Sequence, residues 1–129
     1  MTIEFTVPGR PVPMARPRVT AHGTYTPKTC RIYKHCVESL AKAAMLSNDF
    51  APFENEPLEC RVKFIFPLPK SRKNPWATSR PDLDNLYKAV TDAMNGIVYK
   101  DDSQIVRASI EKAYEVSGDG RAEICVSTI

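Results

Sequence analysis

The eleven prolines divide this 129-residue chain into intervals that can form regular structure and intervals that cannot. Five of them fall within residues 8–28, and four fall within residues 67–81. Because proline lacks a backbone N–H and disfavours the interiors of helices and sheets, both stretches are expected to be loops without helical or strand periodicity. Loops of this length inside a small domain are usually functional or mobile. The secondary structure must therefore form in the intervals between them.

These intervals carry regular patterns of apolar residues. Alternation of apolar and polar residues predicts four strands, over residues 3–7, 58–66, 104–114 and 121–128. Apolar residues at spacings of three and four predict two helices, over residues 29–47 and 83–95. Thr29 is expected to cap the first helix, and Gly96 to end the second. The order β-α-β-α-β-β predicts one α+β domain over residues 1–129, with two main helices on a small mixed or antiparallel sheet.

Charge is distributed unevenly along the chain. The net charge is +3, but residues 1–80 hold 13 Lys and Arg against 6 Asp and Glu, whereas residues 81–129 hold 5 against 9. This asymmetry indicates a polyanionic partner for the first part of the chain. The alternative is two solvated surfaces of different composition. With 43% hydrophobic and 26% charged residues, a disordered or fibrous chain is excluded.

The sequence also predicts where the protein is found. It has no apolar run of the roughly 18 residues that span a membrane, and no signal peptide is visible, so a cytoplasmic location is expected. The cysteines lack the spacing of a zinc site and are expected to be free thiols acting largely as small apolar residues. They are Cys30, Cys36, Cys60 and Cys125. His22 and His35 are isolated in the sequence, and nothing favours a catalytic role for either.

Residues 82–102 contain five aspartates. They are Asp82, Asp84, Asp92, Asp101 and Asp102. In the predicted helix, Asp84, Lys88 and Asp92 are each four residues apart and form a stripe opposite the apolar side. One aspartate precedes that helix, and the last two lie in a turn after it. An EF-hand loop is excluded, because its sixth and twelfth positions would be Tyr87 and Ala93.

Carboxylates that converge near a helix start can hold Mg²⁺. Such a cation lowers the pKa of a bound water and neutralises charge on a phosphate, as phosphodiester hydrolysis requires, and a neighbouring lysine adds positive charge. The alternative is that each aspartate is only a cap, an ion-pair partner or a turn residue. The density of carboxylates favours a cation, because so many negative charges would otherwise repel one another.

Two motifs resemble the RusA family of Holliday-junction resolvases, in its prophage-type branch. Residues 80–96 read RPDLDNLYKAVTDAMNG and residues 98–105 read VYKDDSQI. The segments FTVPG, PVPMARPR and YTPK, within residues 5–28, are also similar, and the match extends over residues 3–127. The resemblance implies a RusA-like fold and a homodimer that binds four-way DNA junctions and makes paired, symmetrical nicks with Mg²⁺, for which Mn²⁺ is the alternative cation. It places the activity in DNA recombination and repair.

The resemblance also implies roles for individual residues. The metal-binding aspartates of the family correspond to Asp82, Asp84 and Asp102, and its active-site lysine corresponds to Lys88. Asp92 and Asp101 match acidic positions of the motif and are expected to be supporting residues. Phosphate contacts are expected from the two basic loops. The candidates are Arg10, Arg16, Arg18, Lys28, Lys70, Arg72, Lys73 and Arg80.

Two other functions are compatible with the same residues. One is a catalytically silent module that binds DNA junctions, in which the aspartates are only caps and turn residues. The other is a less selective nuclease that acts on flaps or forks. Cleavage of a labelled four-way junction in the presence and absence of Mg²⁺ distinguishes these functions from the resolvase.

Overall fold

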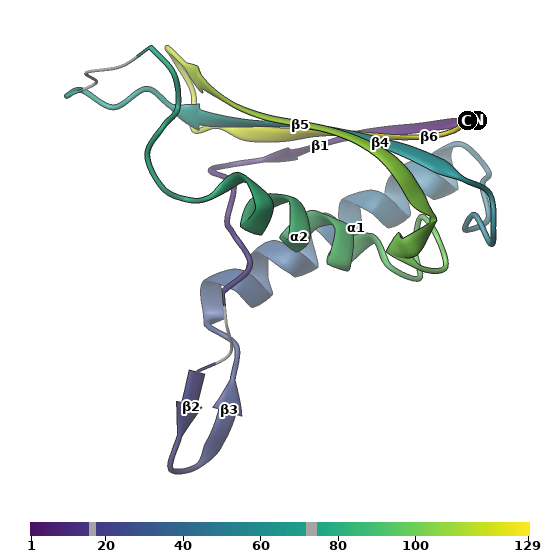
Figure 1. Ribbon diagram of the computed structural model, residues 1–129, viewed down its shortest axis with the longest axis horizontal. Coiled ribbons are helices and arrows are strands. Elements are labelled where there is room, and N and C mark those ends of the chain that lie inside the picture. The colour runs from purple at the N-terminus through teal and green to yellow at the C-terminus, as the bar shows by residue number, and fades with distance from the viewer. Residues whose placement is uncertain (16–17, 72–74) are drawn as a thin grey trace.

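The computed structural model describes residues 1–15, 18–71 and 75–129, apart from the side chains of Arg18, Thr20 and Tyr25. It has an α+β fold in which a four-stranded mixed sheet carries two helices on one face (Figure 1). The strands of this sheet, in spatial order, are β1 (Thr2–Pro8), β6 (Arg121–Thr128), β4 (Leu58–Pro67) and β5 (Ile105–Glu115). The helices are α1 (Lys28–Ser47) and α2 (Leu83–Met94). The α+β prediction is therefore confirmed.

The direction of the strands decides where α2 lies. β6 is antiparallel to both β1 and β4, whereas β4 and β5 are parallel neighbours. Parallel neighbours need a crossover connection, and α2 lies within the connection between β4 and β5. At the start of β5 the register shifts, because Leu58 is opposite Ile105 while Glu59 is opposite Arg107, so Val106 is an extra residue in the strand.

The core fills the space between the helices and the covered face of the sheet. From α1, the residues Tyr33, Val37, Ala41 and Met45 are buried, four positions apart. From α2, the buried apolar residues are Leu86, Ala89, Val90, Ala93 and Met94. This spacing is the one that predicted the two helices, and it fixes which side of α2 is left to carry polar residues. Among the described residues, no helix is both long and apolar enough to cross a membrane.

Two expectations for the N-terminal region are wrong. The stretch of residues 8–28 is not a continuous loop, because β2 (Arg18–Thr20) and β3 (Gly23–Tyr25) form a hairpin that projects from the body of the molecule (Figure 1). Its strands are too short for alternation to reveal them. Thr29 does not cap α1: the N-cap is Pro27, whose carbonyl accepts hydrogen bonds from the backbone of Cys30 and Arg31. At the end of α2, Gly96 has the expected left-handed backbone, with a φ of 79°.

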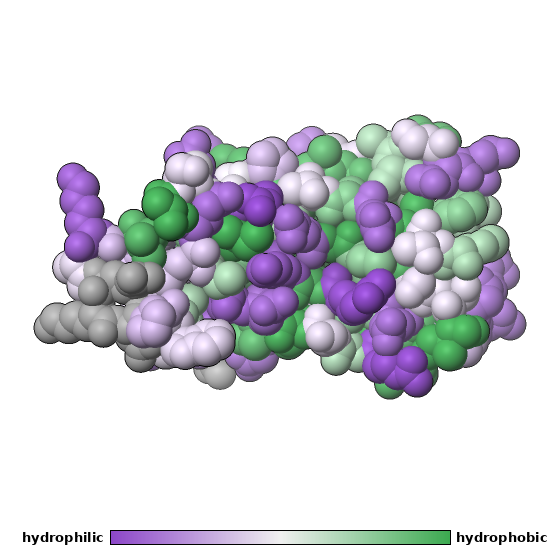
Figure 2. Space-filling view, turned by 90° about the horizontal axis from the view of Figure 1, so that it is seen from above, coloured by the Kyte–Doolittle hydropathy of each residue, from purple (hydrophilic) through white to green (hydrophobic). Residues whose placement is uncertain are grey.

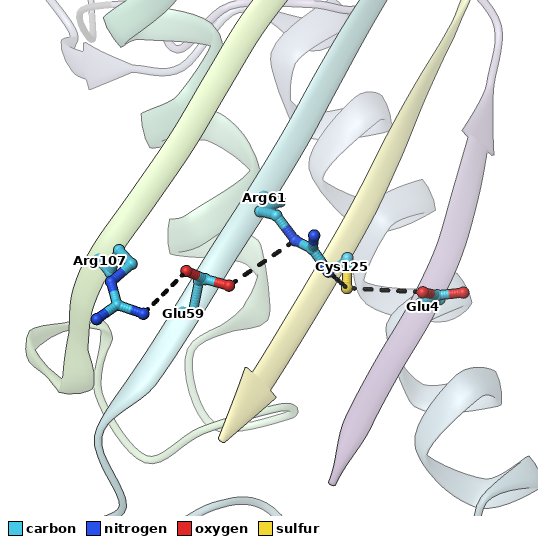
Figure 3. Close-up of polar contacts among 5 residues, drawn as sticks. All are labelled: Glu4, Glu59, Arg61, Arg107 and Cys125. Carbon is cyan, nitrogen blue, oxygen red and sulfur yellow. Dashed lines mark hydrogen bonds and ion pairs between the residues drawn. The ribbon is translucent and has the colours of Figure 1, made fainter. Parts of the chain in front are cut away.

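Among the residues that the structure describes, no helix covers the other face of the sheet, and hydrophilic residues extend across much of it (Figure 2). One row of polar contacts crosses all four strands (Figure 3). Glu59 pairs with Arg107 at 3.4 Å and with Arg61 at 3.9 Å. Arg61 also donates to the Cys125 sulfur, whose thiol contacts Glu4. The four cysteines are free, as predicted, but only Cys60 is buried, and Cys125 belongs to this polar row.

Candidate active site

The polar side of α2 is arranged as the sequence predicts. Asp84 and Lys88 are exposed and Asp92 is half-buried, whereas the apolar side of the helix packs into the core. Thr91 is the one buried polar residue of the described part of α2, and its hydroxyl donates to the carbonyl of Tyr87 at 3.0 Å. The helix therefore presents an acidic stripe with a single lysine in its middle.

Three candidate residues gather near the C-terminal half of α2. The Lys88 ammonium lies 3.7 Å from a carboxylate oxygen of Asp92. Asp102 accepts a hydrogen bond of 3.4 Å from the side-chain amide of Asn95, which follows the helix directly. All three candidates line one pocket of about 410 Å³, together with Tyr87 and Thr91 and with residues 105–108 at the start of β5. We call this the Lys88 pocket.

The two adjacent aspartates in the turn after α2 have different surroundings. Asp101 belongs to the turn itself: its carboxylate accepts a 2.6 Å hydrogen bond from Ser103, and its backbone N–H donates to the Gln104 side chain at 3.1 Å. The contact with the Gln104 side chain is one half of the capping box of a short 3₁₀ helix, η1 (Asp102–Gln104); in the other half, the Gln104 backbone N–H donates to the Asp101 carboxylate. Asp102, in contrast, faces α2 and the Lys88 pocket. Asp101 is therefore a turn residue, whereas its neighbour Asp102 is placed as a candidate ligand.

A buried tyrosine fixes this turn against α2. The Tyr99 hydroxyl donates to the carbonyl of Thr91 at 2.7 Å, and the side chain is fully buried. Burial raises the pKa of Tyr99 well above its ordinary range, so the phenol stays protonated and remains a donor. Burial likewise raises the pKa of Tyr87 far above its usual value and that of Cys60 to about 11. Neutral, packed groups therefore support the charged residues of the pocket.

Asp82 lies at the opposite end of α2, immediately before the helix. It lines a second pocket, of about 550 Å³, between the start of α2 and the N-terminal loop that follows β1. We call this the loop pocket. Since α2 has 12 residues and rises about 1.5 Å per residue, Asp82 and Asn95 are separated by about 18 Å of helix. Asp84 is near the Asp82 end, one turn before Lys88.

The three predicted metal ligands are consequently not gathered in a single chain. Among the described residues there is no group of three or more His, Cys, Asp or Glu side chains that could hold a metal ion. The donor chemistry suits a hard divalent cation, because carboxylate oxygens are what Mg²⁺ prefers. Within one chain, however, Asp82 and Asp84 stand at one end of α2 and Asp102 at the other.

Lys112 was missed in the sequence and is part of this region. From β5, its ammonium donates to the carbonyls of Ser79 at 3.0 Å and of Pro81 at 2.9 Å. Both residues lie within three positions of Asp82 on its N-terminal side, so Lys112 fixes the backbone from which α2 starts. A signal was present: Ile110, Lys112 and Tyr114 share the covered face of β5, where a lysine is out of place.

The basic candidates divide by position. Arg10 and Arg80 both line the loop pocket beside Asp82, and the Arg10 guanidinium lies 5.3 Å from the centre of the Phe66 ring. Lys28 and Lys70 are exposed at other places. Arg16, Arg72 and Lys73 lie outside the described residues, as does the side chain of Arg18.

Comparison with known proteins identifies the family. A family model described as endodeoxyribonuclease RusA matches residues 8–127. The chain is 31% identical over 145 residues to protein YqaN of Bacillus subtilis (strain 168), covering 98% of this chain and 96% of that protein. It is 46% identical over 61 residues to a crossover junction endodeoxyribonuclease of Lactococcus phage r1t, covering 46% of this chain and 47% of that one. The chain is thus a nuclease that belongs to the RusA endodeoxyribonuclease family.

Proposed function

We propose that this protein resolves four-way DNA junctions as a homodimer, by paired symmetrical nicks that depend on Mg²⁺ or Mn²⁺. The observation that carries the proposal is the Lys88 pocket, in which the only lysine of the acidic stripe pairs with Asp92 and lines the same pocket as Asp102, in a nuclease of this family. The relative from a phage is itself named for crossover junctions, and it supports the choice of substrate and a prophage origin.

In the proposed reaction, Asp82, Asp84 and Asp102 are the carboxylates that hold the cation, and Lys88 contacts the phosphate. A bound divalent cation would supply an acidified water and neutralise phosphate charge. Lys88 would stabilise the negative charge that develops on the phosphate oxygens, and Asp92 holds its ammonium in place at 3.7 Å. Asp101 would act through the turn, by keeping Asp102 directed toward α2.

The separation of the carboxylates along α2 supports the homodimer. Asp82 and Asp102 lie at opposite ends of the helix, so one chain does not complete the set. In a dimer, the Asp82 end of one chain can complete the Asp102 end of its partner. A four-way junction has approximate two-fold symmetry, and a two-fold dimer presents two equal sites to opposed strands. We propose that the dimer acts in the cytoplasm, on intermediates of DNA recombination and repair.

Cleavage of a labelled four-way junction tests the function. Paired symmetrical nicks in Mg²⁺ and none in its absence are the expected result. Retention of the junction without any cut would show a silent binding module, and equal cleavage of flaps and forks would show a less selective nuclease.

A substitution tests the assignment of the metal ligands. Asp82→Asn is expected to lower the cleavage rate by about two orders of magnitude or more, because it removes a charged donor at the reacting centre. Junction binding should stay intact or become tighter, because a negative charge that faces the DNA backbone is lost. Gel-shift and cleavage assays on the same preparation give both values, and Mg²⁺-dependent nicking at the wild-type rate would contradict the assignment.

A further inference from the structure

Hydrogen bonds fix the backbone on both sides of the loop pocket. Met14 in the N-terminal loop donates its backbone N–H to the carbonyl of Asn85 in the first turn of α2, at 2.9 Å. On the other side, Lys112 holds the carbonyls of Ser79 and Pro81. The Cys30 thiol, at the start of α1, contacts the carbonyl of Pro13 at 3.5 Å. Both walls are thus tied to regular elements, and the pocket exists before any ligand arrives.

The lining of this pocket is apolar inside and charged at its edge. Residues 11–15, which read PVPMA, supply most of the apolar surface together with Pro81, and these residues are buried or half-buried. Arg10, Arg80 and Asp82 are exposed and line the same pocket. At about 550 Å³, the pocket falls in the range of sites that hold small organic groups.

This combination suits one component of the substrate. A nucleobase has a flat, weakly polar face, and the phosphates on either side of it are anions that guanidinium groups bind. In a regular duplex, stacking covers the faces of the bases. A base that is unpaired or at a branch point is the least costly to extrude. Apolar surface bordered by two arginines is therefore better matched to an unstacked nucleotide than to a continuous duplex.

We propose that the loop pocket receives an unstacked nucleobase of the branched DNA, adjacent to the phosphodiester that is cut. The proposal rests on the proposed function, because Asp82, a candidate metal ligand, stands on the edge of this pocket. A base held there places its neighbouring phosphate beside Asp82, with Arg10 and Arg80 on the flanking phosphates. The pocket would then contribute to selection of the cleavage position, independently of the Lys88 pocket.

Fluorescence of 2-aminopurine tests the proposal without cleavage. Once the cut positions are mapped in Mg²⁺, the analogue is placed at each position around them, and the full-length protein is added to saturation in Ca²⁺. Unstacked 2-aminopurine is bright unless an aromatic ring quenches it, and none of the described lining residues is aromatic. We expect fluorescence to rise at one position beside the cut and to stay unchanged at the others.

Two tryptophan variants make a matched pair. Ala15→Trp fills the pocket and places a quenching ring in it, so a base at this site loses its bright signal whether it is excluded or quenched. The variant is expected to abolish the rise in fluorescence at saturating protein, and exclusion of the base is read separately as junction binding weakened about tenfold. Leu46→Trp adds the same bulk at an 81% exposed position of α1 outside the pocket, and it should behave like the wild type. Met14→Ala, which removes apolar surface without adding bulk, should reduce the rise if Ala15→Trp does not fold.

The outcomes separate this proposal from the proposed function. A protein that cuts no junction would overturn both. Efficient junction cleavage with no bright position in the wild type, or a full rise in both Ala15→Trp and Met14→Ala, would overturn the nucleobase pocket alone.

Discussion

Adjacent aspartates with different surroundings, Asp101 and Asp102, give the sharpest test at the scale of single residues. Asp101→Ala removes the capping box of η1 and is expected to cost about 1 kcal/mol of unfolding free energy, with cleavage lowered only modestly. Asp102→Asn keeps the shape of the side chain and is expected to lower the cleavage rate about a hundredfold or more, with little change in stability. Denaturant unfolding and junction cleavage are measured on both variants. A large loss of cleavage in Asp101→Ala together with a loss of stability in Asp102→Asn would contradict these roles.

Lys88 permits a similar comparison. Lys88→Met removes the charge from the acidic stripe but keeps the aliphatic stem, and we expect the cleavage rate to fall about a hundredfold. Lys100→Met is the control, since Lys100 is also exposed and precedes the turn but does not line the Lys88 pocket. Single-turnover cleavage with saturating protein separates chemistry from binding. Equal losses in the two variants would show that only general attraction to DNA is involved.

At the scale of elements, the hydrogen bonds that join β5 to the start of α2 come from Lys112. Lys112→Met leaves two carbonyls without their donor, and we expect cleavage to fall about tenfold because Asp82 and Asp84 lose their fixed starting point. Lys63→Met, on the open face of the same sheet, is the matched control. Lys112→Arg should recover part of the cleavage rate, because arginine also carries N–H donors. If Lys112 only stabilises the fold, Lys112→Met will lower the melting temperature and leave the cleavage rate per folded molecule unaltered.

The periodic elements could be predicted from the sequence, and the contacts between them could not. The spacing of apolar residues predicts both helices that pack on the sheet. It also predicts the polar stripe of α2 that contains Asp84 and Lys88. The hairpin of β2 and β3 was not predicted because three-residue strands carry no usable alternation. Pro27 is the N-cap in place of Thr29, because its φ of −54° and ψ of 143° give the non-helical backbone of an N-cap while its carbonyl accepts the first hydrogen bonds of the helix. Lys112 is paired only through tertiary structure, since its partners are more than 30 positions away.

At the scale of the whole molecule, a mixture of two inactive variants tests whether the proposed homodimer shares its site between two chains. The Asp82→Asn and Asp102→Asn variants are each expected to be inactive alone. If the ligands come from different chains, a mixed dimer has one intact site, so it should nick one strand of the junction. If the ligands come from the same chain, every site in the mixture stays broken. Denaturing gels of junctions labelled on each strand read the result directly, and an inactive mixture that is shown to contain mixed dimers would contradict the shared site.

Because β5 contains an extra residue at its start, Val106, the number of residues in this strand determines where Asp102 and Lys112 lie. Asp102 reaches the Lys88 pocket just before β5 begins, and Lys112 reaches the start of α2 from within it. If one residue between them is deleted and the strand keeps its register, Asp102 is drawn out of its pocket. If the turn keeps its place instead, Lys112 changes to the open face of the sheet. The number of residues between these two positions is therefore as constrained as their identity, and no compensating side chain restores a strand that is one residue short.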